Sequence, residues 1–356
     1  MLVIDDKEET TMFVRERDIS KELWHGPRSG TNGILSSFGI KNAFPIDKIT
    51  NYLPNLIKNS NVILFDKLIN REITKKIEEC CEEVRNNKHY KGTNIMSTIR
   101  LIKSESEIEI MRESCKIAAL SMINAMKLSK KYKKEQEIAT IMEYECKMRG
   151  AERLSYPPVV AGGINALTLH YITNDMLINK GDLLLVDAGC EYHGYSSDIT
   201  RTWPIDGRFT EPQLLIYNLV LKANIECINM CKINNNVTLR TIHQKAVEIL
   251  SNGLIELGII KNKEEYINYY PHSIGHYLGM DVHDTNDLPT NIPLQPGMII
   301  TIEPGLYLPD LPSIPPPFRN IGIRIEDDVL ITNNLPDVLT HLVPKDPFII
   351  EQLINN

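Results

Sequence analysis

The spacing of apolar residues divides the chain into two parts. Up to residue 97, short apolar runs such as residues 61–65 alternate with stretches of helical periodicity, of which residues 70–86 are charged and amphipathic. Beyond this point the helical patterns become longer and are followed by paired strand-like runs. The sequence therefore predicts a smaller mixed α/β domain over residues 1–97 and a second domain over residues 98–356.

The second part contains several strong helix signals. Ser104 and Glu107 have the spacing of a capping box, which predicts a helix start. A further helix is expected over residues 134–148, with Gly150 suited to end it. Two longer helices are expected over residues 211–234 and 239–258.

The rest of the second part alternates between strand-like runs and turns. Residues 309–317 are rich in proline and are predicted to form a loop, because proline can neither continue a helix nor donate to a sheet. Helices that cover one face of a curved, mostly antiparallel sheet would explain this pattern. The predicted fold class is α+β.

Composition and charge exclude some partners. The chain has 39 Lys and Arg against 46 Asp and Glu, and the net charge of -7 argues against non-specific nucleic-acid binding. No apolar run approaches the length of about 18 residues that suggests a membrane span. The first residues lack a basic or Arg-rich presequence. We therefore expect no nucleic-acid partner, no membrane partner and no targeting signal in this sequence.

Residues 183–203 contain the first candidate metal ligands. Two strand-like segments flank a turn predicted at residues 191–194, and this pairing sets Asp187 opposite Asp198. Opposed residues in an antiparallel sheet have Cβ atoms about 5 Å apart, so the two like charges would destabilise the sheet. A bound cation would resolve the conflict. The alternative is one exposed turn aspartate and one structural aspartate.

Histidines and glutamates supply further candidates. His272, His276 and His283 lie within twelve residues of one another, and imidazole both binds transition metals and moves protons near neutral pH. Glu303 and Glu326 lie in apolar strand-like runs, where an unpaired carboxylate is costly. Alternation places Arg324 on the same face as Glu326, so a buried pair of Arg and Glu is the alternative for that segment.

The combined set of two Asp, two Glu and one ligating His suits hard or borderline divalent ions such as Mn²⁺ or Co²⁺. Four carboxylates fit two ions better than one. In two-metal sites, ions about 3.5 to 4 Å apart lower the pKa of a bridging water towards about 7.

These motifs resemble the methionine aminopeptidase, aminopeptidase P and prolidase family, whose catalytic domain has the pita-bread fold. The resemblance covers the chain from about Ile99 to the C-terminus. It implies that Asp198 and Glu326 bridge two metals and that Glu303 is also the general acid and base. The implied metal ligands are Asp187, Asp198, His276, Glu303 and Glu326. The implied non-ligand catalytic residues are His170, His272, His283 and Arg324; the three histidines would hold the substrate or relay protons.

Within this family, residues 169–174, 191–204, 275–284 and 318–328 are similar to the aminopeptidase P branch, above all its eukaryotic mitochondrial type. This likeness implies hydrolysis of the N-terminal Xaa-Pro bond by a metal-bridged hydroxide. The implied cofactors are two divalent ions, Mn²⁺ first, with Co, Zn or Fe as alternatives. The implied substrates are peptides with proline in the second position.

The resemblance also bears on assembly and location. A homodimer is implied by family analogy, and the location would be mitochondrial or cytoplasmic. Residues 15–30 resemble the middle of the family's N-terminal domain, so the first domain is expected to be incomplete.

Three other functions stay open at this stage. Prolidase shares every ligand and differs mainly in how it reads the C-terminus of the substrate. A mitochondrial processing exopeptidase would remove one residue without a strict need for proline. A binding module that holds peptides without cleaving them belongs to a different class, and such relatives typically lose metal ligands.

Overall fold

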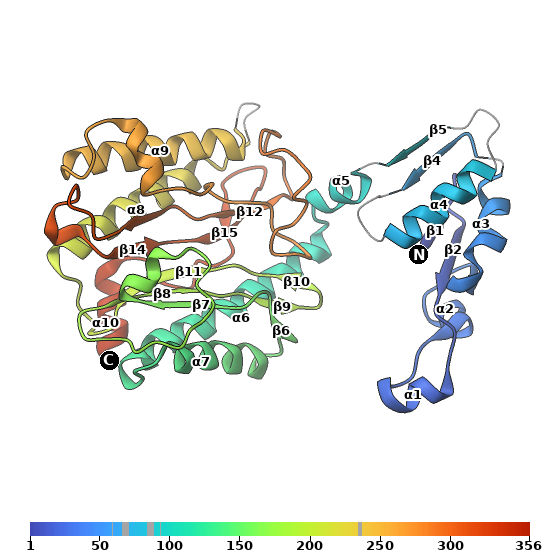
Figure 1. Ribbon diagram of the computed structural model, residues 1–356, viewed down its shortest axis with the longest axis horizontal. Helices are drawn as coiled ribbons and strands as arrows, with labels where there is room; N and C mark the ends of the chain where they lie inside the picture. Colours follow the sequence, from blue (N-terminus) through green and yellow to red (C-terminus); the bar gives the residue numbers. More distant parts are fainter. Residues whose placement is uncertain (59, 66–70, 84–88, 93, 234–236) are drawn as a thin grey trace. The chain divides into compact units, whose positions relative to one another are not determined.

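The structure is a computed structural model that describes residues 1–58, 60–65, 71–83, 89–92, 94–233 and 237–356. It divides into two compact units, Met1–Met96 and Ser97–Asn356 (Figure 1). No helix among the described residues has the length and apolar character needed to cross a membrane.

The first unit combines two small sheets with helices. One sheet has the order β1-β2-β3, antiparallel and then parallel, and the other pairs β4 with β5 in parallel. The predicted strand near residues 61–65 and helix near 70–86 are confirmed, although residues 70 and 84–86 lie outside the described part. The elements are β1 (Leu2–Ile4), β2 (Thr10–Val14), α1 (Ile19–His25), α2 (Gly30–Ser37), β3 (Asn42–Pro45), α3 (Ile49–Ile57), β4 (Val62–Phe65), α4 (Arg71–Glu83) and β5 (His89–Gly92).

The helices of the second unit begin where the capping signals place them. Glu107 N donates to Ser104 Oγ, and the Glu107 carboxylate accepts from Ser104 N at 2.8 Å, so the predicted capping box is confirmed. The helix α10 was not predicted, although Asp346 caps it and Pro347 opens it. The predicted ends of the two long helices were wrong, because α8 ends at Met230 and not at residue 234, and α9 ends at Glu256 and not at residue 258. The helices are α5 (Ile95–Leu101), α6 (Glu105–Leu128), α7 (Glu135–Met148), α8 (Glu211–Met230), α9 (Leu239–Glu256) and α10 (Pro347–Asn355).

Every strand pair described in the second unit is antiparallel, as predicted. In Figure 1 these strands lie between α6 and α7 on one side and α8 and α9 on the other. The proline-rich segment is irregular except for a 3-10 turn at Pro316–Phe318, which the prediction missed. The strands are β6 (Arg153–Leu154), β7 (Val159–Gly162), β8 (Leu183–Asp187), β9 (Cys190–Tyr192), β10 (Tyr195–Ser196), β11 (Thr200–Pro204), β12 (Ile299–Ile302), β13 (Gly305–Leu308), β14 (Ile321–Arg324), β15 (Asp327–Leu330) and β16 (Asp337–Val338).

The predicted hairpin register was wrong by two residues. The turn is only two residues long, because His193 and Gly194 both adopt positive φ (49° and 80°), as a tight hairpin turn requires. Asp187 therefore pairs with Thr200 and not with Asp198. Since a shift of two residues keeps every side chain on its own face, the two aspartates still share one face, as diagonal neighbours.

The two glutamates also lie differently from the prediction. Glu303 and Glu326 are not inside strands; each lies at the junction of two consecutive strands, β12 with β13 and β14 with β15. Asn224 of α8 is buried behind these junctions and donates from Nδ2 to the carbonyls of Ile302 (3.1 Å) and Ile325 (3.3 Å). The residue before each glutamate is thus held by the same side chain.

Replacing Asn224 with leucine is expected to lower the free energy of unfolding by about 2 to 4 kcal/mol, because two buried carbonyls lose their donor. It should also weaken metal binding, since both glutamates lose a backbone anchor. Chemical denaturation and metal titration of the variant measure the two effects. Unchanged metal affinity would contradict the anchoring role.

Candidate metal centre

One pocket of the second unit brings the predicted site residues together. Its volume is about 680 Å³, and it lies among the strand junctions, the hairpin and the loops that carry the histidines. All nine candidates line it: His170, Asp187, Asp198, His272, His276, His283, Glu303, Arg324 and Glu326. Residues separated by more than 150 positions in sequence thus share one cavity.

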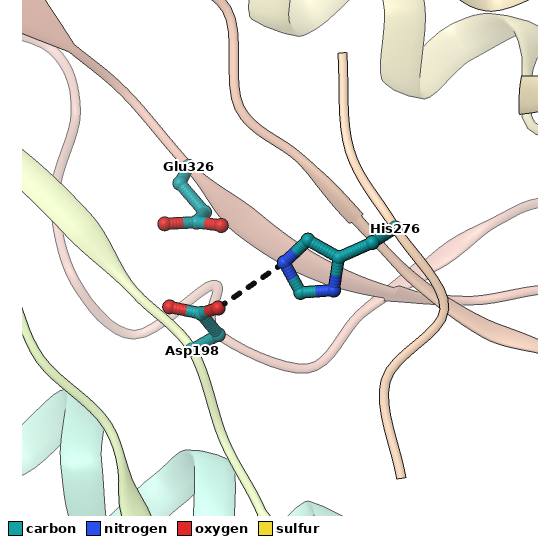
Figure 2. A group of neighbouring side chains, drawn as sticks. All are labelled: Asp198, His276 and Glu326. Carbon is teal, nitrogen blue, oxygen red and sulfur yellow. Dashed lines mark ion pairs between the residues drawn. The ribbon is translucent and has the colours of Figure 1, made fainter. Parts of the chain in front are cut away.

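The centre of the pocket is a group of three side chains (Figure 2). Asp198, His276 and Glu326 each offer one ligand atom, and these atoms lie within 4.8 Å of one another. Asp198 follows β10, His276 lies in the loop before β12, and Glu326 lies at the junction of β14 and β15. Asp198 and Glu326 are buried, with 5% and 2% of their surface exposed.

The orientation of His276 makes this group a candidate cation site. Its Nδ1 lies 3.1 Å from the Tyr277 carbonyl, which can only accept, so Nδ1 carries a hydrogen and Nε2 presents a lone pair in the neutral ring. Nε2 faces Asp198 Oδ2 at 3.4 Å and Glu303 Oε1 at 3.6 Å. A lone pair directed at two carboxylates is repulsive unless a cation lies between them.

In the metal-free protein that cation is a proton. Burial opposes the charged ring, but the hydrogen bond to Asp198 and the charge of Glu303 raise the pKa of His276 to about 9. A divalent ion held by the same atoms would supply more charge at the same place. The donor set therefore fits a divalent metal.

Asp187 joins the group through Tyr156. The Tyr156 hydroxyl lies 2.5 Å from Asp187 Oδ1 and also contacts Asp198 Oδ1, so it bridges the two aspartates. The other Asp187 oxygen, Oδ2, forms an ion pair with Arg324 at 2.6 Å. These contacts hold both carboxylates on the pocket side of the hairpin.

Arg324 does not form the buried pair with Glu326 that was the alternative from the sequence. Its ion-pair partner is Asp187, and Thr200 connects it to Glu326: the Thr200 hydroxyl donates to Glu326 Oε2 (2.6 Å) and accepts from Arg324 Nε (3.1 Å). The alternation argument placed Arg324 and Glu326 correctly on one side. It could not identify the partner, because the aspartate comes from another strand.

The carboxylates carry an electrostatic conflict in the absence of metal. Burial raises the pKa of Glu303 to about 7, against the opposing charges of His276 and Arg324. Burial and the neighbouring carboxylates, Asp198 first, hold the pKa of Glu326 well above its usual range. Burial also raises the pKa of Asp187 despite the adjacent guanidinium. A bound cation would lower the pKa of these carboxyl groups and allow all three to ionise together.

The remaining histidines differ in what holds them. His272 is fixed at both nitrogens: Nδ1 lies 2.8 Å from the Ser273 carbonyl and Nε2 lies 2.9 Å from the Tyr307 hydroxyl, which itself accepts from Arg324 at 2.9 Å. Burial and the Arg324 charge lower the pKa of His272 to about 3, so this ring is neutral. Its Nδ1 is 3.8 Å from the Glu303 carboxylate.

His283 and His170 lie farther out. The ring of His283 meets the ring of His276 edge to face at a centroid distance of 4.5 Å, and burial lowers the pKa of His283. His170 lies on the loop between β7 and β8, and its side chain is exposed at the pocket. Among the described residues, neither ring has partners at both nitrogens in the way that His272 does.

Sequence reasoning missed Tyr156, Thr200 and Tyr307. Thr200 had a usable signal, because it lies two residues after Asp198 and strand alternation puts both on one face. Tyr307 had only its place in an apolar run, and Tyr156 had none, since nothing in its neighbourhood distinguishes it from a packing tyrosine. Their roles depend on which distant groups the fold brings to their hydroxyls.

Comparison with known proteins identifies relatives of both units. Residues 109–333 match "Metallopeptidase family M24", and residues 1–65 match "Aminopeptidase P, N-terminal domain". The human "Xaa-Pro aminopeptidase 3" is 41% identical, with 96% of this chain and 69% of the relative covered. The Arabidopsis thaliana "Intermediate cleaving peptidase 55, mitochondrial" is 40% identical, with 99% and 71% covered.

The chain is also similar in structure to a solved member of this group. The crystal structure of Icp55 from Saccharomyces cerevisiae superposes with a TM-score of 0.90 at 36% identity, covering 98% of this chain and 82% of that one. The predicted α+β fold with a pita-bread second domain and a smaller first domain is confirmed by this likeness.

Proposed function

Because the chain belongs to metallopeptidase family M24, we propose that it is an aminopeptidase that removes the first residue of peptides with proline in the second position. Relatives at about 40% identity bear the names Xaa-Pro aminopeptidase and intermediate cleaving peptidase. The observation that carries the proposal is the group of Asp198, His276 and Glu326, whose ligand atoms lie within 4.8 Å of one another.

We further propose that two divalent ions, Mn²⁺ first, are held by Asp187, Asp198, His276, Glu303 and Glu326. The family match supports the use of a divalent metal. The four candidate carboxylates that line one pocket support two ions. When bound, such ions lower the pKa of water and polarise a peptide carbonyl. Asp198 and Glu326 both belong to the central group with His276 and are the proposed bridging ligands, as the family resemblance implies.

The proposed roles of the other residues follow from their positions. Glu303, which lines the pocket beside His272 and His276, would take a proton from water and give it to the leaving prolyl nitrogen. That nitrogen belongs to a tertiary amide and must be protonated to leave. His170, exposed at the pocket, would donate to the developing oxyanion. His272 and His283 would orient the substrate, and Arg324 would hold Asp187.

The substrate assignment is tested with chelator-treated protein. Free alanine is expected to be released from Ala-Pro-Ala only after Mn²⁺ is added, with kcat/KM at least about 100-fold above that for Ala-Ala-Ala. No turnover of Ala-Pro-Ala with Mn²⁺, Co²⁺, Zn²⁺ or Fe²⁺ would refute the proposed function.

The same assay also tests the two rival enzyme functions. Faster cleavage of the dipeptide Ala-Pro than of Ala-Pro-Ala would favour a prolidase. Equal turnover of Tyr-Pro-Ala and Tyr-Ala-Ala would favour a processing exopeptidase, the alternative raised by the relatives named intermediate cleaving peptidase.

We also propose that the protein is located in the mitochondrion. Similarity to the Arabidopsis relative named as mitochondrial favours the mitochondrion over the cytoplasm. Subcellular fractionation of the native organism, with an antibody against the chain, decides between the two.

A further inference from the structure

One buried carboxylate outside the metal centre has an unusual set of partners. Glu135, the first residue of α7, is fully buried (0% exposed), and it forms no ion pair within the part of the chain that the structure describes. Its oxygens instead accept four hydrogen bonds, from Gly162 N (2.8 Å), Asn165 Nδ2 (2.8 Å), the Tyr171 hydroxyl (2.8 Å) and Met176 N (3.1 Å).

Gly162 is the last residue of β7, and the other three donors belong to the connection that follows it towards β8. Apart from the 3-10 turn Gly163–Leu167, this connection contains neither helix nor named strand. Its far end is held by an isolated bridge from Leu177 to Lys134 and by Asn174, which bonds Val160 N and the Pro158 carbonyl. Around His170, the side chain of Glu135 supplies the contacts to Asn165 and Tyr171. His170 lies inside this stretch, between the donors Asn165 and Tyr171.

The chemistry of the site requires a carboxylate. Four donors converge, and an ionised carboxyl group is the side chain that accepts at every position without donating. Burying the charge is costly and is offset only when all its lone pairs are used, as they are here. A glutamine of the same shape would turn its NH₂ group towards two of the donors.

The residues on either side of His170 are held in place by packing and by the hydrogen bond to Glu135. Tyr171, the next residue, donates to Glu135, and its ring packs with Leu169 against a buried cluster that includes Leu185 and Tyr307. Both neighbours of His170 are thus held inward while the imidazole is exposed at the pocket.

We propose that Glu135 is a positioning residue that fixes the loop of residues 162–176 and thereby aims His170 at the carbonyl oxygen of the scissile peptide bond. This inference rests on the proposed function, because it takes the role of His170 from there. Glu135 itself touches neither substrate nor metal ligand. Its effect on catalysis passes through His170 alone.

A double-mutant cycle with Glu135→Gln and His170→Ala tests this route, using the full chain, Mn²⁺ and Ala-Pro-Ala. Glu135→Gln is expected to lower kcat about 10- to 100-fold, the effect of a displaced catalytic group, with KM and bound metal changed less than about twofold. In the His170→Ala background the same substitution should change kcat less than about twofold, because the group that it positions is gone.

The matched control is Glu137→Gln on the same helix. Glu137 accepts from Lys133 N and Lys134 N at 2.9 Å and so caps α7, but it does not contact the loop of residues 162–176. Its loss should lower the melting temperature and leave kcat unchanged. If Glu135→Gln does not fold, Tyr171→Phe takes its place in the cycle, because it removes one of the four donors and keeps the ring.

The outcomes separate the two proposals. If the wild-type protein is active and His170→Ala lowers kcat, but Glu135→Gln lowers it by the same factor in both backgrounds, the positioning role is overturned and the proposed function stands. If His170→Ala leaves kcat unchanged, the role of His170 and the positioning role fail together. An inactive wild-type protein contradicts the proposed function itself.

Discussion

Replacing Glu303 with glutamine is expected to lower kcat for Ala-Pro-Ala about 1,000-fold. A glutamine cannot take a proton, so the group poised between the attacking water and the leaving prolyl nitrogen is lost, and proton transfer of this kind contributes about 10² to 10⁴ in rate. The Glu303 carboxylate lies 3.8 Å from His272 Nδ1 and 3.6 Å from His276 Nε2. Steady-state kinetics with saturating Mn²⁺ measure the effect.

The comparison variant for this prediction is Tyr307→Phe. It removes the hydroxyl that lies 2.9 Å from His272 and leaves the glutamate in place. A smaller loss of kcat, of about tenfold, is expected, because the orientation of His272 is relaxed and Arg324 loses one acceptor, while the proton-transfer group stays. Equal losses in the two variants, or a Glu303→Gln protein with nearly normal turnover, would remove Glu303 from its assigned role.

The second large effect is expected at Glu326. With glutamine there, Mn²⁺ should no longer stabilise the protein, whereas the wild-type protein should gain about 2.7 kcal/mol at a metal concentration 100 times Kd. Activity should fall in parallel, since Glu326 is a proposed bridging ligand. Thermal unfolding with and without metal measures the stabilisation.

The metal-free Glu326→Gln protein provides the internal check. Burial and the neighbouring carboxylates hold the pKa of Glu326 well above its usual range, so ionising this group is unfavourable without metal. A neutral amide of the same shape should therefore leave the metal-free protein as stable as the wild type or more stable. A large loss of stability without metal would show that Glu326 is a structural residue instead.

The hairpin shows how far sequence periodicity could predict the site. The predicted pairing set Asp187 opposite Asp198, and this register was wrong by two residues, although the two aspartates still share a face. The turn length depended on positive φ at His193, a conformation that a residue other than glycine adopts rarely. Because the error was an even number of residues, the faces were preserved.

Contacts between distant segments could not be predicted in the same way. The pattern around Glu303 and Glu326 indicated strands, but each glutamate lies between two consecutive strands. There the side chain of Asn224 donates hydrogen bonds to the carbonyl before each glutamate. Glu135 likewise begins a predicted helix, yet its partners lie 27 to 41 positions away. Periodicity describes one element at a time, whereas these roles arise when two elements meet.

The central claim is that five side chains from four segments form one centre for two divalent ions. Calorimetric titration of chelator-treated protein with Mn²⁺, followed at each addition by the rate of alanine release from Ala-Pro-Ala, tests it most directly. We predict two bound ions per chain in the wild type, with activity rising as they bind, and fewer than two in Glu326→Gln. Wild-type protein that binds no Mn²⁺, or a Glu326→Gln variant that binds two ions with normal activity, would contradict the claim.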